Sequence, residues 1–173
     1  MPEVIIIAGP NGAGKTTFAI EYVLERRKHL DFVNADEIAR EVLRTGLPQL
    51  RAEARAARNM LERIDSLVRS GTDFLFETTL ATLTYAQKIP VWRRSGYVIS
   101  LIYLRLPSVE ASTARVNRRI EAGGHGIPEK IIRRRFDKSM AYLNDVYKPI
   151  VNEWYIWDSL EGSFALAQSW DQS

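Results

Sequence analysis

A glycine-rich segment between a predicted strand and a predicted helix constrains this chain more than any other feature. Residues 9–16 read GPNGAGKT and match the pattern G-x-x-x-x-G-K-[ST] at every fixed position. The apolar run at residues 4–8 is typical of a strand buried on both faces of a parallel sheet, and residues 17–27 fit a helix. A strand, a glycine loop and a helix in that order predict a phosphate-binding loop.

The residue types in this loop suit a nucleoside triphosphate. Glycines allow backbone conformations that turn N–H groups inward around an anion, and the helix that follows adds the positive end of its dipole. Lys15 is expected to reach the terminal phosphates, and the Thr16 hydroxyl to ligate the Mg²⁺ that accompanies ATP. The alternative is a chance match in a glycine-rich turn. The residues expected to bind ATP are Gly9, Pro10, Asn11, Gly12, Ala13, Gly14, Lys15, Thr16 and Thr17.

Length and composition favour one domain over residues 1–173, because a chain of this length leaves little room for a second core. The sequence has no cysteine, which excludes disulfides and thiolate chemistry. The N-terminal apolar run is too short for a signal sequence or a membrane span, so we expect a cytoplasmic protein without a membrane partner. A net charge of +3 fits an anionic ligand but does not separate a nucleotide from a nucleic acid.

The order of predicted elements indicates an α/β fold. Alternation of strands and helices predicts a parallel sheet with helices on both faces, as in P-loop NTPases, with a helical lid at about residues 108–146. Strands are expected at residues 1–8, 32–36, 73–77, 97–104 and 155–157. Helices are expected at residues 17–27, 37–44, 49–70, 85–96, 107–122 and 128–146, with a short terminal helix after a turn at 158–163.

Polar residues at the ends of two predicted strands are candidates for binding an acceptor. Asp36 is the candidate general base, and its structural alternative is to cap the following helix. Glu77 is expected at the sheet edge, on magnesium through water or on the acceptor, unless it is a buried acid satisfied by backbone. Thr78 and Thr79 fit either a substrate contact or a turn, and Asn34 joins the substrate-binding candidates.

The predicted lid is rich in arginine and contains a glycine hinge. A guanidinium group can bridge phosphate oxygens, and Arg118 is the first candidate, followed by Arg115. Most other basic residues of this segment are expected on a solvated face, and at most one of residues 133–135 is expected to point to the site. His125 lies between hinge glycines and is a candidate for touching substrate, or a loop histidine with no such role.

Four segments together resemble the small bacterial zeta-toxin-like P-loop kinases: AGPNGAGKTT at residues 8–17, VNADEIAR at 33–40, FETTLA at 76–81, and GGHGIPEKIIRRRF within 114–143. The resemblance implies an ATP-dependent kinase, because founding zeta toxins phosphorylate UDP-N-acetylglucosamine and are neutralised by a small antitoxin. It matches Lys15 to the phosphate-loop lysine, Asp36 to the acid that acts on the sugar hydroxyl, and an arginine around residues 115–118 to a lid arginine. The second lid arginine of the larger toxins falls at His125 here, and the chain is shorter.

The sequence therefore predicts a phosphotransferase that moves the terminal phosphate of ATP to a hydroxyl of a small acceptor, for which a UDP-N-acetyl sugar is one candidate. Lys15, magnesium and a lid arginine would stabilise the transferring group while Asp36 activates the acceptor. Two alternatives remain: an ATPase that switches a protein partner, and a nucleic-acid-associated NTPase or end-kinase. The basic residues cluster near the expected phosphate site, so a nucleic-acid partner is not favoured.

Overall fold

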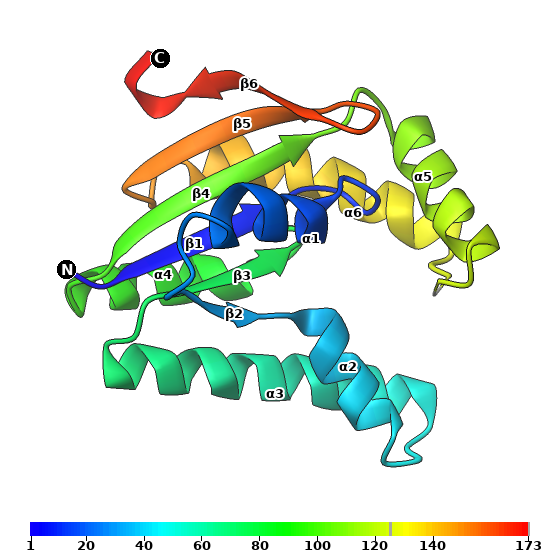
Figure 1. The fold of residues 1–173 in the computed structure, drawn as a ribbon, viewed down its shortest axis with the longest axis horizontal. Helices are drawn as coiled ribbons and strands as arrows, with labels where there is room; N and C mark the ends of the chain where they lie inside the picture. Colours follow the sequence, from blue (N-terminus) through cyan, green and yellow to red (C-terminus); the bar gives the residue numbers. More distant parts are fainter. Residues whose placement is uncertain (125, 173) are drawn as a thin grey trace.

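A twisted six-stranded sheet forms the centre of the computed structural model, which describes residues 1–124 and 126–172 except for the side chains of Asp36, Gln49, Leu50, Glu53 and Gln172 (Figure 1). The strands are β1 (Glu3–Ala8), β2 (Asp31–Val33), β3 (Phe74–Thr78), β4 (Val98–Arg105), β5 (Glu153–Ser159) and β6 (Phe164–Ser169). Their order is β2-β3-β1-β4-β5-β6. The first five run parallel and β6 pairs with β5 antiparallel, so the predicted α/β class is confirmed with one antiparallel edge.

Helices cover both faces of this sheet. In chain order they are α1 (Lys15–Phe18), which continues as a π-helix (Ala19–Leu24), α2 (Ala35–Leu43), α3 (Gln49–Ser70), α4 (Thr84–Arg94), α5 (Val109–Glu121) and α6 (Glu129–Tyr142), which continues as a π-helix (Leu143–Tyr147). A 3-10 turn (Trp170–Gln172) ends the described chain. Among the described residues, no helix is long and apolar enough to cross a membrane.

The central strand β1 explains why the sheet needs cover on both sides. Its side chains alternate between the two faces, and both sets are buried. Val4 and Ile6 pack with α3 and α4, whereas Ile5 and Ile7 pack with α1 and its π-helical continuation. The apolar run at residues 4–8 therefore places the glycine loop at the middle of the sheet, where β3 and β4 flank it.

The prediction of a short terminal helix was wrong. Residues 164–169 form β6, which returns along β5 through a tight connection at Leu160–Ser163 whose Gly162 has φ +75°. The segment FALAQS has weak helical capping signals, and its pairing with β5 satisfies backbone groups that a surface helix would expose. The secondary structure of residues 164–169 is therefore determined by pairing with β5 and not by local propensity.

Candidate active site

The phosphate loop is packed so tightly that its glycines are required by neighbouring atoms as well as by backbone angles. Gly12 has φ +80°, and a Cβ atom built there would lie 2.9 Å from the Cβ of Arg115. Gly9 has φ +146°, and its Cβ would lie 2.5 Å from the carbonyl oxygen of Leu104. These contacts hold the loop against α5 and the end of β4, so larger residues would displace it.

Two side chains that follow the loop have defined partners. The ammonium group of Lys15 donates to the carbonyl oxygens of Gly9 and Pro10, at 3.0 Å each, so it lies over the loop that it closes. The hydroxyl of Thr16 donates to the carboxylate of Glu77, at 2.9 and 3.1 Å. Thr16 lies in the first turn of α1, and Glu77 is the second-last residue of β3. They are brought together because β1 and β3 are parallel neighbours with Ile7 beside Glu77.

Thr16 and Glu77 provide the donor set that Mg²⁺ prefers. Magnesium is bound in nucleotide sites through hydroxyl and carboxylate oxygens together with water and phosphate. The Glu77 side chain is only 8% exposed and directs its carboxylate to the first turn of α1. The residues present therefore fit the ion, with Thr16 and Glu77 as its holders on the protein side.

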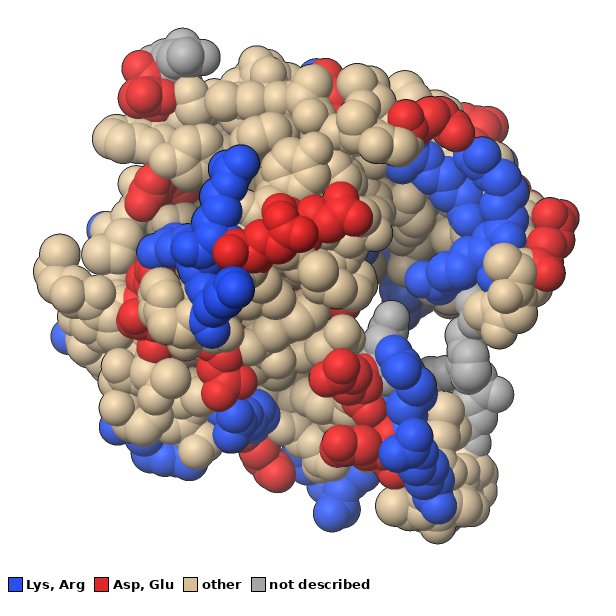
Figure 2. Space-filling view, viewed as in Figure 1, with Lys and Arg blue, Asp and Glu red and all other residues tan. Residues whose placement is uncertain are grey.

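One cavity of 760 Å³ joins the phosphate loop to the neighbouring helices. Its donor end is lined by Lys15 and Thr16, and three arginines, Arg115, Arg119 and Arg135, approach from α5 and α6. The opposite wall is formed by short or apolar side chains of α2 and α3: Ala35, Ala39, Ala56, Ala57, Met60 and Leu61. Figure 2 shows the molecule hollowed here, with lysine and arginine side chains gathered on the α5 side.

The turn after β3 supplies hydroxyl groups to this cavity. Thr78 and Thr79 line it, and Leu80 takes φ +59°, an unusual value for a residue with a side chain. The N–H of Leu80 donates to Thr78 Oγ1 at 3.0 Å, and the Leu80 side chain is fully buried, which anchors the strained turn. Thr78 therefore takes part in the turn and also lines the cavity, and its contact with a substrate stays a prediction.

Tyr85 also lines the cavity, although the sequence did not indicate it. Burial raises the pKa of its hydroxyl to about 12, so the phenol is neutral at physiological pH. Its hydroxyl lies 3.7 Å from the sulfur of Met60, and its ring packs against Phe76. Tyr85 is therefore a fixed neutral group at the wall opposite the phosphate loop.

The N-terminus of α2 corrects one structural alternative for Asp36. The helix begins at Ala35, and the side-chain oxygen of Asn34 accepts from the N–H of Glu37 at 3.4 Å. Asn34 therefore occupies the capping position that the sequence left open to Asp36, which falls inside the helix. The backbone of Asp36 lies between the cavity-lining residues Ala35 and Ala39, while its side chain lies outside the described part of the structure.

The structure separates the two candidate lid arginines. Arg115 donates to Ser159 Oγ at 2.7 Å, to the Ser159 carbonyl oxygen at 3.0 Å and to the Gly12 carbonyl oxygen at 3.4 Å. Arg118, the first candidate, points instead to Glu161 on the surface, at 2.9 Å, and does not join the lining of this cavity. His125 lies outside the described residues.

The structure also brings to the site residues that the sequence did not single out. Arg119 and Arg135 line the cavity, and helical periodicity alone could not tell which basic residues of α5 and α6 face inward. Ser159 donates to the carbonyl oxygen of Ala13 at 2.8 Å, and Phe164 packs 3.1 Å from the position of a Cβ on Gly14. The β5–β6 hairpin thus packs against the phosphate loop. The sequence did not predict this contact, because residues 164–169 were expected to be helical.

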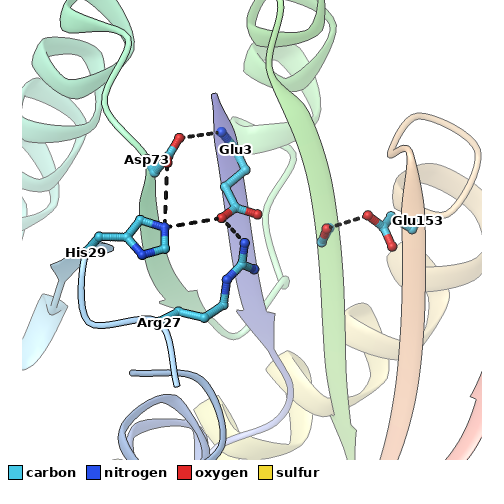
Figure 3. A network of polar contacts seen from close by, with 6 residues as sticks. Glu3, Arg27, His29, Asp73 and Glu153 are labelled. Atoms are coloured by element: carbon cyan, nitrogen blue, oxygen red, sulfur yellow. Dashed lines mark hydrogen bonds and ion pairs between the residues drawn. The ribbon is translucent and has the colours of Figure 1, made fainter. Parts of the chain in front are cut away.

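A second polar cluster lies at the far ends of the strands, away from the phosphate loop (Figure 3). Glu3, His29 and Asp73 approach one another there, with His29 Nε2 3.8 Å from Glu3 and 3.7 Å from Asp73. Arg27 already pairs with Glu3, and Asp73 accepts from the Glu3 N–H at 2.9 Å. These contacts tie the start of β1 to β3 and account for the cluster as a structural one.

Comparison with known families now identifies the relatives of this chain. Residues 4–145 match the AAA domain family. The chain belongs to this family. The match covers β1 through α6, and so includes the loop, both walls of the cavity and helices α5 and α6.

The individual relatives share little sequence identity with this chain. An uncharacterized protein of Haemophilus influenzae is 26% identical over 140 residues, which is 78% of this chain and 92% of that protein. The structure of the PezAT chromosomal toxin-antitoxin system of Streptococcus pneumoniae superposes with a TM-score of 0.71 at 18% identity, covering 100% of this chain and 74% of that one. The fold that the resemblance to zeta-toxin-like P-loop kinases predicts is thus confirmed.

Kinases also occur among the similar structures. A gluconokinase from Sinorhizobium meliloti has a TM-score of 0.58 at 17% identity, covering 92% of this chain and 84% of that one. AvrRxo1-ORF1:-ORF2 with ATP has a TM-score of 0.69 at 16% identity, covering 98% of this chain and 58% of that one. These likenesses show that the chain has the P-loop NTPase fold. One of the similar structures, AvrRxo1-ORF1:-ORF2, was determined with ATP.

Proposed function

We propose that this protein is an ATP-dependent phosphotransferase acting on a hydroxyl of a small acceptor. The observation that carries the proposal is the continuous cavity in which the phosphate loop, the Thr16–Glu77 pair and three arginines share one space with the α2–α3 wall. A nucleotide switch needs a phosphate site but no adjoining room for a second small molecule. An acceptor lying against the α2–α3 wall would face the terminal phosphate directly.

The proposed reaction moves one phosphoryl group. The acceptor oxygen forms a bond to the γ-phosphorus as the bond from that phosphorus to the β–γ bridging oxygen breaks, and ADP leaves. The acceptor proton goes to the carboxylate of Asp36, the proposed general base. The position of Asp36 within α2, between Ala35 and Ala39 of the cavity wall, supports this role.

The protein's own groups bind and neutralise the phosphates. Loop N–H groups and Lys15 are proposed to hold the β- and γ-phosphates, and Thr16 and Glu77 to hold Mg²⁺. When bound, the ion would supply positive charge that offsets the negative charge of the phosphates. Arg115, fixed by Ser159 and the loop, and Arg119 and Arg135 from the lid helices are proposed to balance the charge on the transferring group.

Substitution of Asp36 tests the proposal. With radiolabelled ATP and a panel of sugars, nucleosides and other small alcohols, the wild-type chain should transfer label to at least one acceptor. Asp36→Asn should lower kcat for that transfer by about a hundredfold to a ten-thousandfold, the usual contribution of a general base. Asp137→Asn, an acid on the outer part of α6, is the matched control and should keep wild-type turnover.

Label that reaches only water would instead support an ATPase that switches a protein partner. Label on the 5′ end of oligonucleotides would support the nucleic-acid end-kinase. A small antitoxin remains a proposed partner, since one similar structure is a toxin-antitoxin system. Co-purification with the product of an adjacent small gene would test it.

A further inference from the structure

The two ends of the cavity differ sharply in charge. Among the described lining residues, the basic side chains come from the phosphate loop and the lid: Lys15, Arg115, Arg119 and Arg135. The α2 and α3 side contributes four alanines, Met60 and Leu61, with no cation among the described side chains. Positive charge is therefore provided for the phosphates of ATP and not for phosphates on the acceptor.

This asymmetry is not due to a shortage of arginine in the helices. α2 carries Arg40, and the first half of α3 carries Arg51, Arg55 and Arg58, but all four side chains are exposed. Ala39 and Ala57 line the cavity next to Arg40 and Arg58 in the sequence. The helices turn their short side chains toward the cavity and their guanidinium groups toward solvent, so a phosphorylated acceptor would meet an uncompensated wall.

Among the described side chains on the acceptor side, the polar groups other than the Glu77 carboxylate are neutral; the proposed base Asp36 is not among those side chains. The neutral groups are the hydroxyls of Thr78, Thr79, Thr82, Thr84 and Tyr85. Thr82 is held in place through its carbonyl oxygen, which accepts from Tyr147 at 2.5 Å. An apolar wall facing a few fixed hydroxyls is the arrangement by which proteins bind compact molecules that combine an apolar face with hydroxyl or amide groups.

From this distribution we propose that the acceptor is a compact alcohol with an apolar face and no phosphate group of its own. The inference rests on the proposed function and gives its substrate class, which differs from a sugar nucleotide. The transferred phosphate would be the first on the product. The hydroxyls of the segment after β3 orient the acceptor, and the alanines of α2 and α3 leave room for its body.

Matched pairs of ligands test this class by binding, independently of turnover. The pairs are N-acetylglucosamine and UDP-N-acetylglucosamine, glucose and glucose 6-phosphate, and 2-phenylethanol and 2-phenylethyl phosphate. Affinities are measured by saturation-transfer NMR on the full chain loaded with Mg²⁺ and a non-hydrolysable ATP analogue. At least one neutral member should bind about tenfold or more tightly than its phosphorylated partner, because burying an unpaired phosphate is costly.

Substitutions in the wall locate the binding. Ala57→Trp fills the acceptor side and should weaken the neutral ligand about tenfold or more, while Ala141→Trp, the same change at an exposed position of α6, should not. Ala57→Lys adds a cation and should shift preference toward the phosphorylated member of the pair. Thermal melting of each variant checks that it is folded.

Three results would overturn the inference: tighter binding of the phosphorylated members, no effect of Ala57→Trp, or no neutral member that binds. Transfer of label from ATP to UDP-N-acetylglucosamine but not to N-acetylglucosamine would do the same and leave the kinase proposal intact. Conversely, neutral ligands that bind at the Ala57 wall and receive no phosphate would support the class of ligand and overturn the phosphotransferase.

Discussion

The two halves of the cavity, the proposed donor half at the phosphate loop and the proposed acceptor half at α2 and α3, are built in different ways. The donor half is held by hydrogen bonds between distant parts of the chain: Ser112 Oγ donates to the Asn11 carbonyl oxygen at 2.5 Å, and Ser159 Oγ to that of Ala13 at 2.8 Å. The acceptor half is walled by alanines on α2 and α3, whose shared core is the small cluster around Val42, Ala52 and Ala56.

This difference indicates which residues of the site can be substituted without disturbing the phosphate loop. A shift in the donor half breaks buried polar contacts and moves a loop that neighbouring atoms already confine. Ala39 and Ala57 line the cavity from α2 and α3, so we expect a change at either residue to alter the shape of the acceptor side with little effect on the loop. We infer that phosphate handling depends on the network and that acceptor choice depends on a few short side chains.

Removing the charge of Lys15 should lower activity more than any other change proposed below. A small effect would contradict the contrast between the donor and acceptor halves. Lys15→Met keeps an unbranched side chain, one atom shorter, but loses the ammonium group that lies over the loop. We expect kcat/KM for transfer to fall about a thousandfold, the scale at which charge stabilisation acts in phosphoryl transfer. Turnover within tenfold of wild type, in a variant with unchanged melting temperature, would contradict a donor role.

Arg115 and Arg118 form a matched pair that sharpens the donor half. Arg115→Gln removes a cavity-lining cation held by Ser159, and kcat should fall about tenfold to a hundredfold. Arg118→Gln removes only an exposed contact with Glu161, and kcat should stay within about twofold. Steady-state kinetics with the same acceptor compare them, and a larger loss at Arg118 would restore it as the lid arginine.

The contrast between the halves also explains what the sequence could predict. The phosphate loop is a local pattern whose strand and helix lie on either side of it, so its fold and partners Lys15 and Thr16 were predictable. Long periodic elements such as α3 were predicted with the observed bounds, Gln49–Ser70. Features that depend on tertiary contacts were not predictable. β6 forms because it pairs with β5, and Arg119 faces the cavity because of how α5 is rotated and packed against α6.

The acceptor half was predicted in part. The strand-end residues Glu77, Thr78 and Thr79 do line the cavity, because parallel strands deliver their ends to one edge. The alanines of α2 and α3 carried no signal, since an alanine on a helix reads as a good helix former whether it faces a core, a ligand or solvent. Only the structure shows that these alanines line the cavity.

Ser159→Ala tests whether the hairpin positions Arg115. The substitution removes the donor to Ala13 and an acceptor for the Arg115 guanidinium, both in a side chain only 3% exposed. We expect a loss of about 1 to 2 kcal/mol in the free energy of unfolding, measured by urea denaturation. The KM for ATP should rise several-fold while Ser163→Ala, a nearby hairpin serine, leaves it unchanged; equal effects of the two variants would argue against positioning.

The smallest expected effect is electrostatic and concerns an ion pair next to the turn of the same hairpin. Arg105 donates to both carboxylate oxygens of Asp158, at 2.7 and 3.0 Å, and these hydrogen bonds hold the pKa of Asp158 below its ordinary value of 3.8. A carboxyl whose pKa is lower in the folded state contributes stability above its unfolded pKa. That contribution is lost as the pH falls through the folded pKa.

The free energy of unfolding should therefore drop between pH 6 and pH 3 by slightly more in the wild type than in Asp158→Asn. Because the Asp158 side chain is 38% exposed, solvent screening limits the difference to a few tenths of a kcal/mol. Urea denaturation at the two pH values, with Asp145→Asn on the π-helix after α6 as the control, measures it. A difference of several kcal/mol would mean that charge pairing, rather than the Ser159 hydrogen bonds, fixes the hairpin against the phosphate loop.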